Sequence, residues 1–136
     1  NPLNDSSLAE REDEYGNITT QSSFYMNGTG IFLFGLRKVP NLVEKTLEVN
    51  GLCLNEIDLV IFHQANAFLL KTLGKKTGIP DEKLYLSLAK TGNTVSSTIP
   101  IALQNAMQDG KAKKGDKILL AAFGVGLSWG ATVVEL

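Results

Sequence analysis

The sequence predicts an α/β domain with a mixed, mostly parallel sheet that carries helices on both faces. Two apolar runs of strand length, residues 57–62 and 117–123, show almost no alternation with polar residues. Such runs are typical of strands that are buried on both faces. Helical patterns of apolar residues at 67–77 and 101–109 lie between them, and each ends at a glycine. Strands that alternate with helices in this way favour parallel crossovers.

The first 23 residues are polar and offer little to a hydrophobic core. They include the run of residues 10–14, in which most side chains are acidic. Because such a segment buries little apolar surface, we expect residues 1–23 to form a weakly ordered linker or surface loop. The domain itself is expected over residues 24–136. The chain begins with Asn1 and not with methionine, so we also expect a fragment of a longer protein.

A long helix is predicted after a short strand at residues 24–26. Apolar residues recur at helical spacing after that strand: Phe32, Leu36, Val39, Val43 and Leu47. Asn50-Gly51 marks the end of the helix. Pro40 lies within the pattern and removes a backbone donor, so we expect the helix to kink or to restart there.

The central part of the chain predicts two further helices and one more strand. Gly78 closes the helix at 67–77, and Pro80 follows as a stop signal. Residues 84–88 are expected to form a strand. Pro100 stands at an early helical position and begins the helix at 101–109, which Gly110 closes.

The C-terminal end predicts a pair of strands joined by a glycine-rich loop. The strand at 117–123 follows the turn Lys114-Gly115-Asp116, and a last strand is expected at 131–135. The loop at 124–130 has the spacing G-x-G-x-x-x-G, and a strand follows it where a dinucleotide-binding motif would have a helix. We therefore expect no cofactor.

Composition excludes several classes of function. With 136 residues, 43% of them hydrophobic, the chain is long enough for one globular domain with a real core. The chain has thirteen basic and fourteen acidic residues and no cluster of basic ones, so its charge does not indicate a nucleic-acid-binding surface. No apolar run approaches the roughly 18 residues that span a membrane. A single cysteine excludes an internal disulfide and a multi-cysteine metal site, and it suits a cytoplasmic protein.

Three loops carry the candidate functional residues. His63, the only histidine, follows the strand at 57–62 and directly precedes a helix. Functional loops of α/β proteins gather at the carboxyl ends of parallel strands, where this histidine lies. Each of these features has a structural interpretation when it is taken alone. His63 can be a structural histidine, Gly92-Asn93 a turn, and the glycine loop a tight connection between two strands. Only their combination indicates chemistry.

The segments Val60-Ile61-Phe62-His63-Gln64-Ala65-Asn66, Thr91-Gly92-Asn93-Thr94-Val95-Ser96-Ser97 and Ala121-Ala122-Phe123-Gly124-Val125-Gly126-Leu127-Ser128-Trp129-Gly130 resemble the C-terminal half of the β-ketoacyl-acyl-carrier-protein synthase III family. The resemblance covers residues 24–136. It implies one half of a thiolase-like fold, in which two similar halves pack around a shared site. It also implies an acyltransferase that condenses an acyl thioester, such as acyl-CoA, with malonyl-acyl carrier protein to initiate fatty-acid synthesis, and a homodimer.

The resemblance also assigns roles to individual residues. His63 and Asn93 would stabilise the enolate that forms when a malonyl thioester loses carbon dioxide. An imidazole N–H and an amide NH₂ suit this task, because both are neutral hydrogen-bond donors. The backbone N–H of Val125 would contribute to the oxyanion hole. Three neighbours would line the substrate pocket: Phe123, Gly124 and Gly126.

The nucleophile of this family is a cysteine in the first half, and nothing in this chain matches that segment. Cys53 stands between Leu52 and Leu54, away from the three motifs, and is interpreted as a packing residue. We therefore expect the chain to lack the attacking thiol and to be inactive alone. Its expected partner is an N-terminal half that carries the nucleophilic cysteine.

The helix after His63 carries the candidate docking residues for a carrier protein, but they do not identify the carrier. The resemblance supports Lys75 and Lys76 as docking positions for an acidic carrier protein, although a solvated helix face explains them equally well. Two positions that are often basic in the family are Phe68 and Leu33 here. Either the basic patch is weaker, or the donor is another carrier or a coenzyme A thioester.

Three other functions stay open at this point. One is a related condensing enzyme of polyketide, quinolone or ketone synthesis, because the fold is shared among them. Another is a noncatalytic subunit that pairs with an active partner. The third is a freestanding binding domain, against which the exposed apolar face of an isolated half argues.

Overall fold

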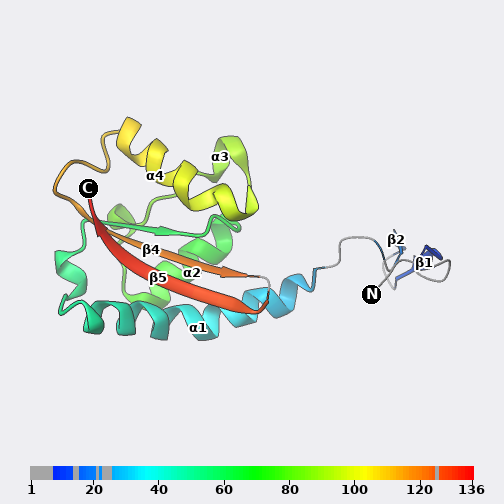
Figure 1. The fold of residues 1–136 in the computed structure, drawn as a ribbon. Coiled ribbons are helices and arrows are strands. Elements are labelled where there is room, and N and C mark those ends of the chain that lie inside the picture. Colours follow the sequence, from blue (N-terminus) through cyan, green and yellow to red (C-terminus); the bar gives the residue numbers. More distant parts are fainter. Residues whose placement is uncertain (1–7, 14–15, 21, 23–25, 125) are drawn as a thin grey trace.

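The computed structural model describes residues 8–13, 16–20, 22, 26–124 and 126–136. A sheet lies at the centre of the domain, with helices α1 and α2 against one face and α4 against the other (Figure 1). This arrangement confirms the predicted α/β class with helices on both faces. No helix in the described ranges is long and apolar enough to cross a membrane.

The central sheet is mixed, as predicted. Its strands β3 (Leu59–Phe62), β4 (Lys117–Gly124) and β5 (Ser128–Glu135) lie in the order β3-β4-β5. β3 and β4 are parallel, and β4 and β5 form an antiparallel hairpin. Every residue of β3 is buried, which explains why its sequence shows no alternation. β5 begins three residues before the predicted strand, because the hairpin pairs Gly124 directly with Ser128.

The long helix α1 (Gly28–Val49) runs as a single element through Pro40, so the predicted restart does not occur. Asn27 caps its start by accepting a hydrogen bond from Gly30 N. Val39 and Val43 beside the proline are buried in the core. Packing of this face offsets the lost backbone bond, because tertiary contacts supply most of the stability of a helix in a protein. Residues 24 and 25 of the predicted first strand lie outside the described residues.

Helices α2 (Ala67–Thr77) and α4 (Thr98–Gln108) correspond to the two predicted helices, although α4 begins three residues earlier. The chain leaves α2 at Gly78, which has a φ of 70°. This left-handed conformation favours glycine at the end of a helix. α1 and α2 enclose the larger core cluster. Ala102 and Ala106 of α4 pack on the opposite sheet face, where their small side chains let the helix approach closely.

The predicted strand at residues 84–88 is wrong. Leu84 makes only an isolated parallel bridge to Val60, and Leu88–Thr91 forms the short helix α3. One backbone hydrogen bond joins the segment to β3, from Tyr85 N to Val60 O at 3.0 Å, and the buried side chain of Gln64 makes the next contacts. Its Oε1 accepts from Ser87 N at 2.7 Å, and its Nε2 donates to Tyr85 O at 3.3 Å and to Phe62 O at 2.8 Å. After this single backbone hydrogen bond, the side-chain amide of Gln64 takes the place of further strand pairing.

The N-terminal segment contains a short hairpin that the sequence did not predict. Strands β1 (Arg11–Glu12) and β2 (Ile18–Thr19) pair antiparallel, and the hairpin lies apart from the domain (Figure 1). The Asp13 carboxylate accepts hydrogen bonds from the main chain and side chain of Asn17, which fixes the turn. All four strand residues are exposed, so the hairpin adds nothing to the core.

Candidate functional site

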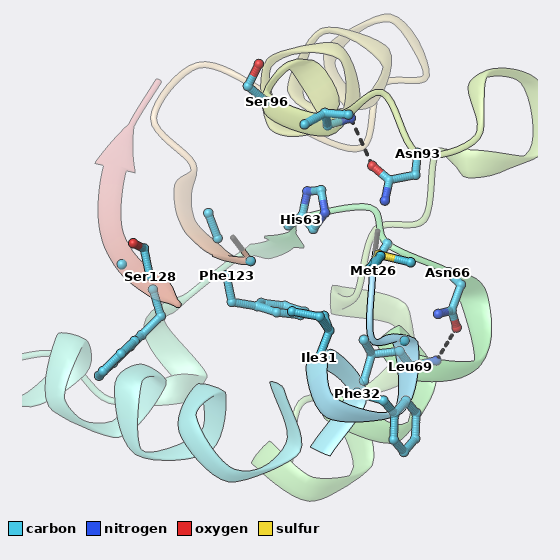
Figure 2. A pocket seen from close by; sticks show the side chains of 17 residues that line it. Met26, Ile31, Phe32, His63, Asn66, Leu69, Asn93, Ser96, Phe123 and Ser128 are labelled. Carbon is cyan, nitrogen blue, oxygen red and sulfur yellow. Dashed lines mark hydrogen bonds between the residues drawn. The ribbon is translucent and has the colours of Figure 1, made fainter. Parts of the chain in front are cut away.

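A cavity of about 510 Å³ lies where β3 and β4 end, at the carboxyl edge of the parallel pair. Figure 2 shows the side chains that surround it. The lining residues come from the segment before α1, from α1 itself, from the three sequence motifs and from α2: Met26, Gly28, Ile31, Phe32, His63, Ala65, Asn66, Leu69, Asn93, Val95, Ser96, Ala122, Phe123, Gly124, Ser128, Trp129 and Gly130. None of these residues carries a charged side chain. The polar groups that the lining offers to a ligand are therefore uncharged.

His63 is held in this cavity from two sides. Its backbone N–H continues the parallel pairing by donating to Ala121 O at 2.8 Å. Its Nδ1 lies 2.7 Å from the hydroxyl of Thr98, at the start of α4, and its ring meets the ring of Phe123 edge to face at 5.9 Å. Because Nδ1 is engaged with Thr98, Nε2 is the ring nitrogen left for a ligand.

Burial lowers the pKa of His63 below its usual value of 6.5. No charged side chain lines the described part of the cavity to oppose this effect. The imidazole is therefore neutral at pH 7. A neutral imidazole can donate a hydrogen bond to an oxygen that gains negative charge without transferring its proton completely.

We expect a titration of the ¹⁵N-labelled imidazole to give a midpoint below pH 6.5. Below that value the unfolded state binds more protons than the folded state, so the free energy of unfolding falls as the pH drops through 6.5. This part of the stability is fully present above the unfolded pKa. His63→Gln should abolish it, since the chain has no other histidine. A midpoint at or above pH 6.5 would contradict a His63 pKa that is lowered by burial.

Asn93 is exposed at the cavity, and its amide orientation follows from one hydrogen bond. Its Oδ1 accepts from Val95 N at 2.9 Å, which leaves Nδ2 as the free donor (Figure 2). Val95 has a φ of 57°, a left-handed conformation that a β-branched residue rarely adopts. Strained residues of this kind cluster where a fold positions functional groups. Here the strained turn orients the amide of Asn93.

The glycine loop is described except for Val125, which lies outside the described residues. Phe123 and Gly124 line the cavity, whereas Gly126 is not among the lining residues. Gly126 has a φ of 137°, and a Cβ there would collide with Ser128 Oγ, so only glycine fits. The ring of Phe123 packs so closely on Gly35 of α1 that a Cβ at residue 35 would lie 3.0 Å from it. The ring is thereby fixed against His63.

Several residues that line the cavity or contact His63 were missed by the sequence analysis. Thr98 contacts His63 from 35 positions away, and such a long-range pair leaves no local pattern. Asn66 caps α2 by accepting from Leu69 N at 2.8 Å and also lines the cavity. An asparagine directly before a helical pattern is an N-cap signal that could have identified it. Trp129, the second residue of β5, also lines the cavity and contacts Phe34 edge to face.

The proposed docking lysines do not lie at the cavity. Lys75 and Lys76 are exposed in the last turn of α2, about 14 Å along the helix axis from Asn66. The rim near Asn66 is aromatic instead. Phe68 is 71% exposed and stacks on Phe32 with ring centroids 5.8 Å apart.

Cys53 is exposed, so its interpretation as a packing residue is wrong. Its backbone N–H donates to the carboxylate of Glu56, and the pair starts a turn of 3₁₀ helix before β3. This position is at the amino end of β3, while the cavity is at the carboxyl end. Cys53 is accordingly absent from the cavity lining. The described residues also contain no cluster of histidine, cysteine and carboxylate side chains that could hold a metal ion.

Residues 47–136 match the family described as 3-oxoacyl-[acyl-carrier-protein (ACP)] synthase III, C terminal. A β-ketoacyl-[acyl-carrier-protein] synthase III from Synechocystis is 42% identical over 85% of this chain and 35% of the relative. A crystal structure of a 3-oxoacyl-(acyl-carrier-protein) synthase III superimposes with a TM-score of 0.96 at 38% identity, over 99% of this chain and 40% of the other. The priming β-ketosynthase of the R1128 polyketide pathway superimposes with a TM-score of 0.78 at 28% identity, over 82% of this chain and 34% of the other.

The chain thus spans about a third of the length of the curated relatives that it matches. In the structural comparisons it likewise covers 40% or less of the other chain. These matches include all three motifs around the cavity, since each lies within residues 47–136.

Proposed function

Because this chain belongs to the β-ketoacyl-[acyl-carrier-protein] synthase III family and matches its C-terminal part, we propose that it supplies the decarboxylation machinery of a condensing enzyme. One observation carries the proposal. His63 and Asn93 bring two neutral donors into a single cavity whose described lining has no charged group. Such a site favours an oxygen that becomes negative during the reaction.

In the proposed reaction the carboxylate of a malonyl thioester leaves as carbon dioxide. The electron pair of the broken C–C bond moves onto the thioester oxygen and forms an enolate. His63 Nε2–H and Asn93 Nδ2–H donate hydrogen bonds to that oxygen. The enolate carbon then attacks an acyl group held as a thioester on a cysteine, and this cysteine leaves as thiolate when the new C–C bond has formed.

The nucleophilic cysteine is proposed to come from an N-terminal half that packs against the cavity side of this chain. Three apolar side chains are exposed around the cavity, Val95, Leu127 and Trp129, and a partner would bury them. The complete enzyme is proposed to be a homodimer that is inactive without this half.

Initiation of fatty-acid synthesis is the proposed pathway, with acyl-CoA as the first substrate and malonyl-acyl carrier protein as the second. The sequence identity to proteins named β-ketoacyl-[acyl-carrier-protein] synthase III supports this pathway. Priming of a polyketide is the alternative that the R1128 similarity favours. Lys75 and Lys76 are proposed to contact the acidic carrier, away from the apolar rim at Phe68. We propose a cytoplasmic location, to which the exposed free thiol of Cys53 is suited.

The product of the complete reading frame should form an acyl adduct when it is incubated with a short acyl-CoA. Mass spectrometry should locate the adduct on a cysteine other than Cys53, and a malonyl thioester should discharge it as a β-ketoacyl product. Cys53→Ser is the matched control, because it removes the exposed thiol of this chain and should leave the adduct unchanged. A folded protein that forms no adduct with any acyl donor would indicate a noncatalytic subunit instead.

A further inference from the structure

We propose that Thr98 is a positioning residue whose hydroxyl donates to His63 Nδ1 and thereby keeps the ring proton on Nε2, facing the cavity. This inference rests on the proposed function, because only a proton on Nε2 can be shared with an enolate oxygen. Thr98 itself does not line the cavity, so it acts through the histidine.

The Thr98 hydroxyl is buried between two acceptors. Thr98 is 3% exposed, and its Oγ1 lies 2.7 Å from His63 Nδ1 and 3.1 Å from Val95 O. A hydroxyl has one proton to donate and lone pairs to accept with. It therefore donates either to the ring nitrogen or to the carbonyl, and the ring takes the complementary tautomer.

The shorter contact favours donation to the ring, because the 3.1 Å contact is long for an O–H···O hydrogen bond. The second arrangement would also oppose the reaction. If Thr98 donated to Val95 O, Nδ1 would carry the ring proton, and Nε2 would turn a lone pair toward the developing enolate. The tautomer of a histidine is commonly set by the partner of its other ring nitrogen in this way.

The carbonyl of Val95 offers the Thr98 hydroxyl a second hydrogen-bond acceptor. When the imidazole gains a second proton at low pH, both ring nitrogens become donors. Nδ1–H then donates to Thr98 Oγ1, and the Thr98 proton turns to Val95 O, so every group remains paired. The same carbonyl belongs to the strained residue whose N–H holds Asn93. One turn thus orients both proposed donors.

The tautomer can be read directly, because the chain contains a single histidine. We expect ¹⁵N spectra of the histidine-labelled chain above pH 7 to show a protonated Nε2 and a bare Nδ1. Thr98→Val removes the hydroxyl at nearly constant shape and should shift the population toward protonated Nδ1. Thr98→Ser should retain the wild-type spectrum. Ser97→Ala removes an exposed hydroxyl next to Thr98 and should change nothing.

The activity readout is decarboxylation of a malonyl thioester by the product of the complete reading frame. Thr98→Val should lower kcat several-fold with little change in KM, because part of the histidine would then turn a lone pair at Nε2 toward the substrate, and Thr98→Ser should restore it. A wild-type spectrum with protonated Nδ1, or a folded Thr98→Val with the wild-type tautomer and rate, would overturn the inference. If Thr98→Val fails to fold, the wild-type spectrum still decides. If the wild type itself does not decarboxylate, the proposed function fails, while the spectra still report on Thr98.

Discussion

His63→Ala should abolish decarboxylation of the malonyl thioester while acylation of the nucleophilic cysteine proceeds at close to the wild-type rate. Loss of one donor to a developing oxyanion costs about 3 kcal/mol of transition-state stabilisation, about a hundredfold or more in rate. The effect is confined to one step, because the acyl group reacts at the cysteine of the proposed N-terminal half. The two steps can therefore be separated by following adduct formation and carbon dioxide release in the same sample.

Asn93→Ala is the companion variant, since it removes the second proposed donor without touching the imidazole. It should also slow decarboxylation selectively. The double variant should be only slightly slower than either single variant if the donors serve the same oxygen, because groups that act as a unit are not additive. Urea unfolding of each variant checks that the fold is retained. Equal loss of acylation and decarboxylation in a folded His63→Ala protein would refute the assignment.

Gln64→Leu should lower the free energy of unfolding by about 2–4 kcal/mol. The side chain is 2% exposed and makes three hydrogen bonds, to Phe62, Tyr85 and Ser87. Leucine fills a similar volume but supplies neither the donor nor the acceptor. The Ser87 N–H and the carbonyls of Phe62 and Tyr85 then lose their hydrogen bonds to this side chain.

Gln104→Leu provides the matched control, because the same chemical change is made at an exposed position of α4. It should alter the free energy of unfolding by about 0.5 kcal/mol or less. Urea denaturation followed by circular dichroism measures both variants under the same conditions. Equal effects at positions 64 and 104 would mean that the buried amide network does not hold the fold together.

Much of the fold could be predicted because the strongest signals in this sequence are local. The buried run that ends at Phe62 identified β3, and the left-handed Gly78 identified the end of α2. The segment at 84–88 was misassigned because it makes one backbone hydrogen bond to β3, and its next ones go to a side chain about twenty positions earlier. No propensity of residues 84–88 themselves contains that information.

The candidate site divides along the same line. The position of His63 and Asn93 at strand and loop ends could be predicted, since motif spacing is visible in the sequence, although their catalytic roles stay a prediction. The contact of Thr98 with His63 could not, because it depends on how α4 is oriented above the sheet. The exposure of Cys53 was also missed, because apolar neighbours on both sides suggested burial where the chain turns outward.

The pairing of β3 with β4 determines when the site can appear during folding. The hairpin of β4 and β5 is local and needs only a short loop, whereas Lys117 meets Asp58 across 59 positions of the chain. Closing a long loop costs more entropy than closing a short one, so distant pairings form later and slow the overall rate. His63 and Phe123 come together only when this distant pair has formed. The cavity around His63 is therefore expected to be among the last parts of the domain to assemble, after the β4–β5 hairpin that forms one of its walls.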